Sequence, residues 1–347
     1  MSIIARNKNS KPRVTVKDLA RDLGMSVATV SRAFHADAVI AKETRGVVLN
    51  RAREIGYSPN PFARSLITKK TRIVGVVVAD ITNPFYPEVL TRLTTELRAI
   101  DMNVMLVAAD QSGEVDEALR LLLNYQPDLA IILAATLSSE AAQECRKAGT
   151  PVIFFNRLSA DDHAFGISCD NILGGQSIAD YLIETGHRRL AYVAALTDAS
   201  TNVARHRGFS ERAVERGIAA PIVIEAGQFS YHAGYEAARK LRDLKKMPDG
   251  VFCANDILAI GFLDGVRREA GLRVPDDISI VGFDDIEMAH WPSHGLTTVQ
   301  QPIEKMLQAT VSLAKELGTN AGREPVVQMI PPGAVIERAT TRRRHDD

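Results

Sequence analysis

The chain has 347 residues, enough for two or three domains, and 46% of them are apolar, which is ample for packed cores. It has no run of 18 apolar residues and no apolar stretch of signal-peptide length near its start, which argues against membrane-spanning and exported proteins. The 42 basic residues balance the 42 acidic ones. The three cysteines form neither a CxxC pair nor an even disulfide framework, which suits a reducing compartment, so we expect a cytoplasmic protein.

The zero net charge conceals an asymmetry. Residues 1–72 hold 15 Lys and Arg against 5 Asp and Glu, a balance of +10, and the rest of the chain carries the compensating −10. A small basic head on a larger acidic body indicates a module that binds a polyanion, joined to a module with another task. The alternative, a solubilising basic tail, does not fit because the segment is patterned.

The segment TVKDLARDLGMSVATVSRAF, which begins at Thr15, predicts two short helices separated by a tight turn. Thr15 has the chemistry to cap a helix over 16–23, and Gly24 permits the left-handed conformation that ends such a helix. Ser26 is a candidate cap for a second helix over 27–34. Apolar positions at helical spacing give each helix one face for a core.

A third helix is expected over 44–55, where its apolar positions can close a small core. Three short helices with a glycine turn between the first two are typical of the helix-turn-helix motif, although other three-helix domains can show the same pattern. In that motif the second helix enters the major groove of DNA. Residues 1–58 are therefore predicted to form an all-α helix-turn-helix DNA-binding domain.

The outward face of the second helix supplies candidate DNA contacts. Arg32 can make a bidentate contact with guanine, and Val27 and Ala28 can contact a thymine methyl group or exclude other bases by shape. Hydroxyl groups can bind phosphates and fix the register of the domain on DNA. The candidates for that role are Thr15, Ser26, Thr29 and Ser31.

Residues 59–72 are predicted to form a hinge helix and linker. A proline suits the first turn of a short helix over 62–67, and a basic cluster follows it. Leu66 could then wedge between base steps in the minor groove, whereas the alternative is an ordinary proline-rich linker. Asn60 and Ala63 are further candidates for DNA contact here.

From residue 73 the pattern changes to alternating strands and helices. Buried-strand runs such as IVGVVVADI, NVMLVAAD and LAIILAAT alternate with helical stretches, and a second series follows Asp170. Such alternation predicts two doubly wound subdomains with parallel sheets, which face each other across a cleft. Ligands of such folds bind at the carboxyl ends of the strands.

Polar residues fall at these predicted strand ends. They are Asp80, Asn156, Asp170, Asn255, Asp256, Asp284 and Asp285. The paired acids could serve acid–base catalysis, but the sequence has no Walker loop, GxGxxG, GxSxG or HExxH motif and no nucleophile beside them. We therefore expect hydrogen bonding to a polyhydroxylated ligand, with no catalytic residues, no cofactor and no metal, and a structural role for the eight scattered histidines.

The order of helix-turn-helix, hinge with ARSL and two α/β halves resembles the LacI/GalR family of bacterial transcription regulators over essentially the whole chain. Collinear matching motifs include VTVKDLARDLGMSVATVSRAF, ETRGVVLNRAREIGYSPNPFARSL, VVADITNPFY, CANDILAIG and GLRVPDDISIVGFDD. The resemblance implies a periplasmic-binding-protein-like core for effector binding and dimerisation. Its expected bounds are 73–340 for the core, 73–170 with 302–329 for the N-subdomain, 171–299 with 332–340 for the C-subdomain, and 341–347 for a tail.

The resemblance also implies roles for individual residues. It carries Val27, Ala28 and Arg32 onto base-reading positions, and Leu66 onto the minor-groove wedge. The positions that match an effector-binding cleft are Phe85, Tyr86, Asn156, Asp170, Thr201, Arg205, Phe229, Asn255 and Asp284. Carboxylates, amides and an Arg fork suit sugar hydroxyls, although Asn255 and Asp284 could instead cap the helices that follow them.

The implied function is a repressor whose affinity for a pseudo-palindromic double-stranded DNA operator is switched by a sugar or sugar acid. A purine or other metabolite acting as a co-repressor is the alternative effector. Two other classes of function are disfavoured. A solute-binding protein is expected to have a signal peptide and no basic head, and a sugar-acting enzyme is expected to have a set of catalytic residues; neither expectation fits this sequence. The tail ATTRRRHDD lacks a leucine heptad, so we expect a homodimer and no tetramer-forming extension.

Overall fold

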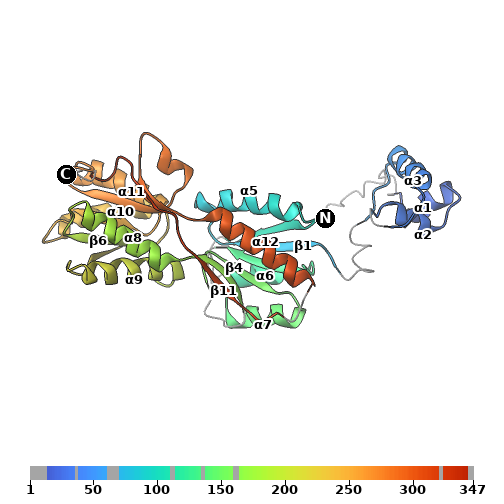
Figure 1. Cartoon of the computed structure of the whole chain (residues 1–347), viewed down its shortest axis with the longest axis horizontal. Helices are drawn as coiled ribbons and strands as arrows, with labels where there is room; N and C mark the ends of the chain where they lie inside the picture. Colours follow the sequence, from blue (N-terminus) through green and yellow to red (C-terminus); the bar gives the residue numbers. More distant parts are fainter. Residues whose placement is uncertain are drawn as a thin grey trace, which may run out of the picture. The chain divides into compact units, whose positions relative to one another are not determined.

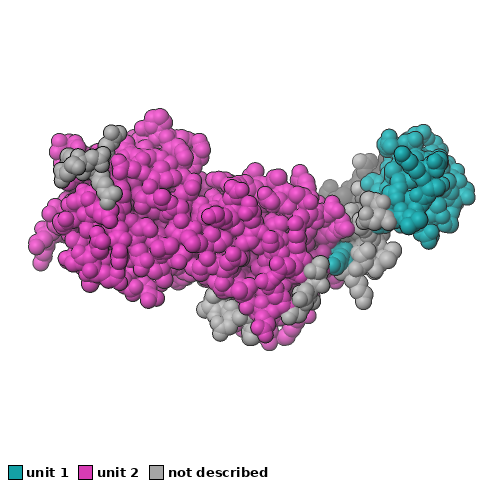
Figure 2. Space-filling model, viewed as in Figure 1, with its two compact units in different colours: residues 1–71 teal, residues 72–347 magenta. Residues whose placement is uncertain are grey.

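The computed structural model of the protein describes residues 14–35, 38–60, 70–109, 114–133, 137–158, 164–319 and 323–342 (Figure 1). The chain divides into two compact units, residues 1–71 and 72–347 (Figure 2). Across the described ranges, every helix is too short or too polar to cross a membrane.

In the described part of unit 1, three helices pack around a small apolar core. They are α1 (Val16–Asp22), α2 (Val27–Ala33) and α3 (Lys42–Glu54). The core consists of Leu19, Ala20, Val30, Ala33, Val48 and Ala52, all buried. The three-helix arrangement predicted from the sequence is confirmed. Each helix ends one residue earlier than expected, and α3 also begins two residues earlier.

Local chemistry sets the turn between α1 and α2. The Thr15 hydroxyl accepts from the backbone N–H of Asp18, whose carboxylate accepts in return from the Thr15 backbone, so α1 begins with a reciprocal capping box. Gly24 adopts a φ of +63°, which a residue with a side chain rarely adopts, and ends the turn after α1. The Ser26 hydroxyl accepts from the Thr29 N–H at 3.1 Å and starts α2.

Unit 2 contains two six-stranded sheets, and all strands of the first are parallel. In the order β11-β5-β4-β3-β1-β2 this sheet consists of β1 (Ile73–Val78), β2 (Asn103–Ala108), β3 (Leu129–Leu133), β4 (Val152–Phe155), β5 (Phe165–Cys169) and β11 (Val327–Ile330). The helices connected with it are α5 (Phe85–Arg98), α6 (Val115–Leu123), α7 (Ser139–Ala148) and α12 (Ile303–Thr319). The strand β3 is buried along its whole length, as helices on both faces of a parallel sheet require.

The second sheet has the order β12-β10-β9-β8-β6-β7 and is parallel except at one edge. Its strands are β6 (Leu190–Ala194), β7 (Ile222–Glu225), β8 (Gly250–Cys253), β9 (Ser279–Asp284), β10 (Thr297–Gln300) and β12 (Val335–Ile336). The edge strand β12 runs antiparallel to β10, a departure from the all-parallel prediction. The associated α-helices are α8 (Asn171–Glu184), α9 (Ser200–Glu215), α10 (Tyr231–Arg239) and α11 (Asp256–Gly265).

The helical patterns of the sequence predict continuous helices over 231–244 and 257–270, and both are divided in the structure. The stretch 231–244 is α10 followed by a 3₁₀ turn, and the stretch 257–270 is α11 followed by a π-helical turn at Val266–Ala270. Gly271, with a φ of +65°, then ends the π-helical turn. These differences affect helix ends, and they leave the predicted order of elements intact.

The chain passes between the two sheets three times, after β5, after β10 and after β11 (Figure 1). The last passage brings the C-terminal segment back to the second sheet. There the hydroxyl of Thr340 accepts from the Thr297 N–H at 2.9 Å and donates to the Ile280 carbonyl at 2.7 Å. Residues near the end of the chain therefore complete the second sheet.

Candidate ligand pocket and nucleic-acid interface

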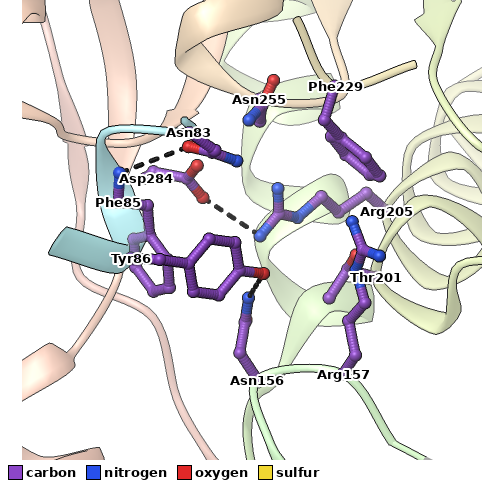
Figure 3. A pocket seen from close by; sticks show the side chains of 10 residues that line it. All are labelled: Asn83, Phe85, Tyr86, Asn156, Arg157, Thr201, Arg205, Phe229, Asn255 and Asp284. Atoms are coloured by element: carbon purple, nitrogen blue, oxygen red, sulfur yellow. Dashed lines mark hydrogen bonds and ion pairs between the residues drawn. The ribbon is translucent and has the colours of Figure 1, made fainter. Parts of the chain in front are cut away.

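A polar pocket in unit 2 is lined by residues that follow strands of both sheets (Figure 3). The first sheet contributes Asn83, Phe85, Tyr86, Asn156 and Arg157, and the second contributes Thr201, Arg205, Phe229, Asn255 and Asp284. Eight of the nine predicted cleft residues are brought together here. The empty space among them, including the part open to solvent, is about 220 Å³.

Arg205, from α9, is the most constrained charged group of this pocket. Its Nε donates to Asn171 Oδ1 at 2.8 Å, and one terminal nitrogen donates to the Ala254 carbonyl at 2.6 Å. The other terminal nitrogen lies 3.2 Å from Asp284 Oδ1. The guanidinium also lies 3.7 Å from the centre of the Phe283 ring, a cation–π contact. The side chain is therefore held in place before any ligand binds.

Asp284, the last residue of β9, is the acceptor that faces this guanidinium. Gln301 Nε2 donates to the same oxygen at 2.7 Å. Burial raises the pKa of Asp284, and the charge of Arg205 and the hydrogen bonds act against that rise. The alternative prediction that Asp284 caps a following helix is wrong, because its carboxylate is turned to Arg205 and the next short helix is preceded by Ile286.

Asp256, predicted to lie at a strand end, is not among the residues that line the pocket. Its carboxylate accepts from the Thr298 hydroxyl at 2.6 Å and from the Ile286 N–H at 2.9 Å. Complete burial, and then the nearby negative charge of Asp284, raise the pKa of Asp256. The residue thus holds the loop that follows β9 in place.

An amide and two aromatic rings form the opposite wall. Asn156 Nδ2 donates to the Tyr86 hydroxyl at 3.1 Å, and the rings of Tyr86 and Phe85 meet edge to face at 5.2 Å. Asn156 Oδ1 is buried without a hydrogen-bond partner, which leaves an acceptor for a ligand group. On the other side, the Arg157 guanidinium lies 4.8 Å from the centre of the Phe229 ring.

Asn255 combines the two roles that the sequence left open. Its Oδ1 accepts from the Leu258 N–H at 3.2 Å and caps α11, and the residue also lines the pocket. Capping and lining are compatible because the amide has a second end.

Asp170 is the predicted cleft residue that the structure does not place in the lining. Its Oδ1 accepts from the Leu173 N–H at 3.0 Å, so it is the N-cap of α8. The carboxylate is turned toward the first turn of that helix, where backbone N–H groups attract negative charge. The expectation that Asp170 contacts the effector is therefore not supported.

Two lining residues, Asn83 and Arg157, were not predicted from the sequence. Arg157 directly follows Asn156, and Asn83 lies in the TNPFY stretch two residues before Phe85, whose N–H donates to Asn83 Oδ1 at 3.2 Å. The sequence signal that could have indicated them is that each lies within two residues of a predicted pocket residue. Among the described residues, His, Cys, Asp and Glu do not gather in groups of three that could hold a metal ion.

The face of α2 that was predicted to read DNA is open to solvent. Val27 is 42% exposed, Ala28, Ser31 and Arg32 are exposed, and Thr29 is half-buried. The hydroxyls of Thr15 and Ser26 already serve as helix caps. Asn60 is exposed, whereas Ala63 and Leu66 lie outside the described residues.

Comparison with known proteins decides the family. Residues 15–60 match the model for bacterial regulatory proteins of the lacI family, and residues 179–341 match that of a periplasmic binding protein-like domain. The chain is 31% identical over 299 residues to the HTH-type transcriptional repressor CytR of Escherichia coli (strain K12), a match covering 85% of this chain and 87% of CytR. The chain belongs to the LacI family.

Other LacI-family relatives are also named as regulators. Catabolite control protein A of Priestia megaterium is 30% identical, with 84% of this chain and 88% of the relative covered. The transcriptional repressor PurR of Histophilus somni (strain 129Pt) is 28% identical, with 94% and 98% covered. The predicted family and the predicted function of transcriptional regulator are confirmed.

Solved LacI-family structures share the fold. The lac repressor dimer bound to operator and the anti-inducer ONPF has a TM-score of 0.83 at 24% identity, with 95% of this chain and 99% of that chain covered. A complex of the regulator CelR with cellobiose has a TM-score of 0.72 at 28% identity, covering 94% and 100%. A regulator from Enterococcus faecium with bound ribose has a TM-score of 0.69 at 30% identity, covering 78% and 98%. The predicted fold class is confirmed.

Proposed function

We propose that this LacI-family protein is a repressor that reads a pseudo-palindromic operator through unit 1 and changes its operator affinity when a sugar or sugar acid occupies the pocket of unit 2. The observation that carries the proposal is the buried, preorganised Arg205–Asp284 ion pair. It lines a pocket together with aromatic and amide side chains that follow strands of both sheets. Because such a regulator acts on the chromosome, we also propose a cytoplasmic location.

The DNA-binding part of the proposal is supported by the solvent-open face of α2. Arg32 and Ala28 are exposed there, and the +10 balance of residues 1–72 supplies the attraction to phosphates. Base reading by Val27, Ala28 and Arg32 remains a proposal. So do the phosphate contacts of Thr15, Ser26, Thr29 and Ser31 and the hinge contacts of Asn60, Ala63 and Leu66.

The ligand part is supported by the chemistry of the pocket. The guanidinium of Arg205 offers donors, Asp284 and Asn156 offer acceptors, and Phe229 offers a ring face, a combination that suits a small ring with several hydroxyl groups. The relatives solved with cellobiose and with ribose bind ligands of that class. A purine co-repressor is the second candidate, since Phe229 could equally stack on a flat base.

The switch is proposed to use the passages between the sheets. Gln301 lies in the passage after β10 and donates a hydrogen bond to Asp284. Closure of the pocket would therefore move a segment that joins the two subdomains. These are the N-subdomain (73–170 with 302–329) and the C-subdomain (171–299 with 332–340). A coupling of roughly 1–3 kcal/mol would change operator affinity about 5- to 150-fold. We propose that the working form is a homodimer, because a two-fold operator matches a two-fold protein.

A thermal-shift screen of the purified protein against sugars, sugar acids, sugar phosphates and purines tests the ligand part. A ligand at 100 times its Kd adds about 2.7 kcal/mol to the free energy of unfolding. Hits confined to purines would reject the sugar assignment. Operator binding with and without the hit then separates an inducer from a co-repressor, and turnover of the hit would indicate an enzyme.

A further inference from the structure

Arg45 connects α3 to the C-terminal end of α2. One terminal nitrogen of its guanidinium donates to the His35 carbonyl at 2.7 Å, and the other donates to the Ala38 carbonyl at 2.8 Å. The side chain is half-buried and spans the connection between the two helices. Both carbonyls belong to the chain that leaves α2.

The position of Arg45 in its own helix is unfavourable without this contact. It lies in the first turn of α3, where its N–H donates to the Ala41 carbonyl and where the helix dipole disfavours a cation. The negative end of the α2 dipole and the two carbonyls compensate for that placement. The planar guanidinium can meet two acceptors at once, which the single ammonium of lysine cannot do with fixed geometry.

The geometry points to a role in DNA reading that rests on the proposed function. We propose that Arg45 is a positioning residue: it fixes the C-terminal end of α2, and so the direction of Arg32, without contacting DNA itself. The His35 N–H donates to the Arg32 carbonyl at 3.0 Å. His35, whose carbonyl accepts from Arg45, is therefore also hydrogen-bonded to the backbone of Arg32, the candidate base reader. At the same end of α2, the ring of Phe34 meets that of Tyr57 edge to face at 5.5 Å.

The test uses the full-length protein and the DNA duplex that the wild type enriches from a random pool. Affinity for this duplex is compared with affinity for a scrambled duplex of the same composition, over a range of salt concentrations. Arg45→Met is expected to lose about 5- to 150-fold of the preference for the enriched duplex, which is the worth of one bidentate base contact. Its salt dependence should stay that of the wild type.

A phosphate contact would behave differently, because each one contributes about 0.9 to the slope of log affinity against log salt. A reduced slope for Arg45→Met, with both duplexes weakened alike, would overturn the proposal. Arg45→Lys keeps the charge but not the two-pronged contact, so it should recover only part of the preference. Full recovery by lysine would show that charge alone suffices and would reject the positioning role.

Arg51→Met is the matched control. Arg51 lies on the same helix but pairs with Asp22 of α1 and with Glu54, away from the end of α2. It should keep the preference, and thermal unfolding shows whether each variant folds. If Arg45→Met does not fold, Arg45→Lys alone decides the outcome. A wild type that enriches no duplex would instead reject the proposed function.

Discussion

Arg205 and Asp284 form an ion pair from which water is almost completely excluded: their side chains are 2% and 4% exposed, and Nη2 lies 3.2 Å from Oδ1. Breaking a buried pair costs more than the pair contributes, because the remaining charge stays buried without compensation. Here the cost is partly offset by the Ala254 carbonyl and the Phe283 ring, which also face the guanidinium.

The first prediction concerns this pair. Asp284→Asn should lower the free energy of unfolding by up to about 3–5 kcal/mol, since it leaves a buried cation. The double variant Arg205→Met with Asp284→Asn should lose less unfolding free energy than the sum of the losses of the two single variants. Urea denaturation of the four proteins at pH 7.5 measures this coupling. Additive losses would contradict the paired arrangement.

The second prediction concerns the pH dependence of stability. His187 is fully buried, with Nδ1 2.9 Å from the Leu182 carbonyl and Nε2 2.8 Å from Ser279 Oγ. Burial lowers the pKa of His187 below its usual 6.5, so the unfolded chain takes up a proton that the folded protein resists. Stability should therefore fall as the pH drops below about 6.5.

His187→Gln removes this titration and is the matched variant. The raised pKa of Asp256 acts with the opposite sign, because the folded state then holds the extra proton. The informative quantity is therefore the difference in unfolding free energy between wild type and His187→Gln, measured by urea denaturation at pH 7.5 and pH 5.5. It should shrink at pH 5.5, and a constant difference would exclude a protonation effect at His187.

The third prediction separates a helix cap from a ligand contact. Asp170→Ala should cost about 0.5–2 kcal/mol of unfolding free energy, the loss of an N-cap, and leave ligand affinity nearly unchanged. Asn156→Ala should instead weaken ligand binding, because it removes the buried acceptor of the pocket wall. Isothermal titration with the hit of the thermal screen measures both. A larger loss of affinity in Asp170→Ala than in Asn156→Ala would restore Asp170 to the pocket.

The fourth prediction concerns Leu66, the proposed minor-groove wedge. Leu66→Ala should lose specific operator binding and keep ligand binding, since the wedge acts on DNA alone. Gel-shift titration with the enriched duplex and thermal shift with the ligand provide the two readouts. Unchanged operator affinity would rule out the wedge.

The sequence was sufficient for the features that depend on short patterns. The capping of α1 by Thr15, the glycine turn at Gly24 and the strand ends that carry Asn156 and Asp284 follow from local chemistry. The role of Asp170 could not be read in this way, because an acid after a strand suits a helix cap and a ligand site equally well. Only the direction of its side chain separates the two.

Long-range contacts were also beyond the sequence. The antiparallel edge strand β12 is only Val335–Ile336, too short for a periodicity signal. Asn171 holds Arg205 from a different helix, and Gln301 holds Asp284 from the passage after β10. These pairings join residues 34 and 17 positions apart, so no spacing rule on one element reveals them.

The return of Thr340 to the second sheet has a consequence for protein synthesis. Unit 1 ends at residue 71, so the helices α1, α2 and α3 can fold while the ribosome is still making the rest of the chain. The second sheet must wait for Thr340, which holds Thr297 and Ile280 together. Translation that stops before Thr340 would therefore release a DNA-reading head without a finished second sheet.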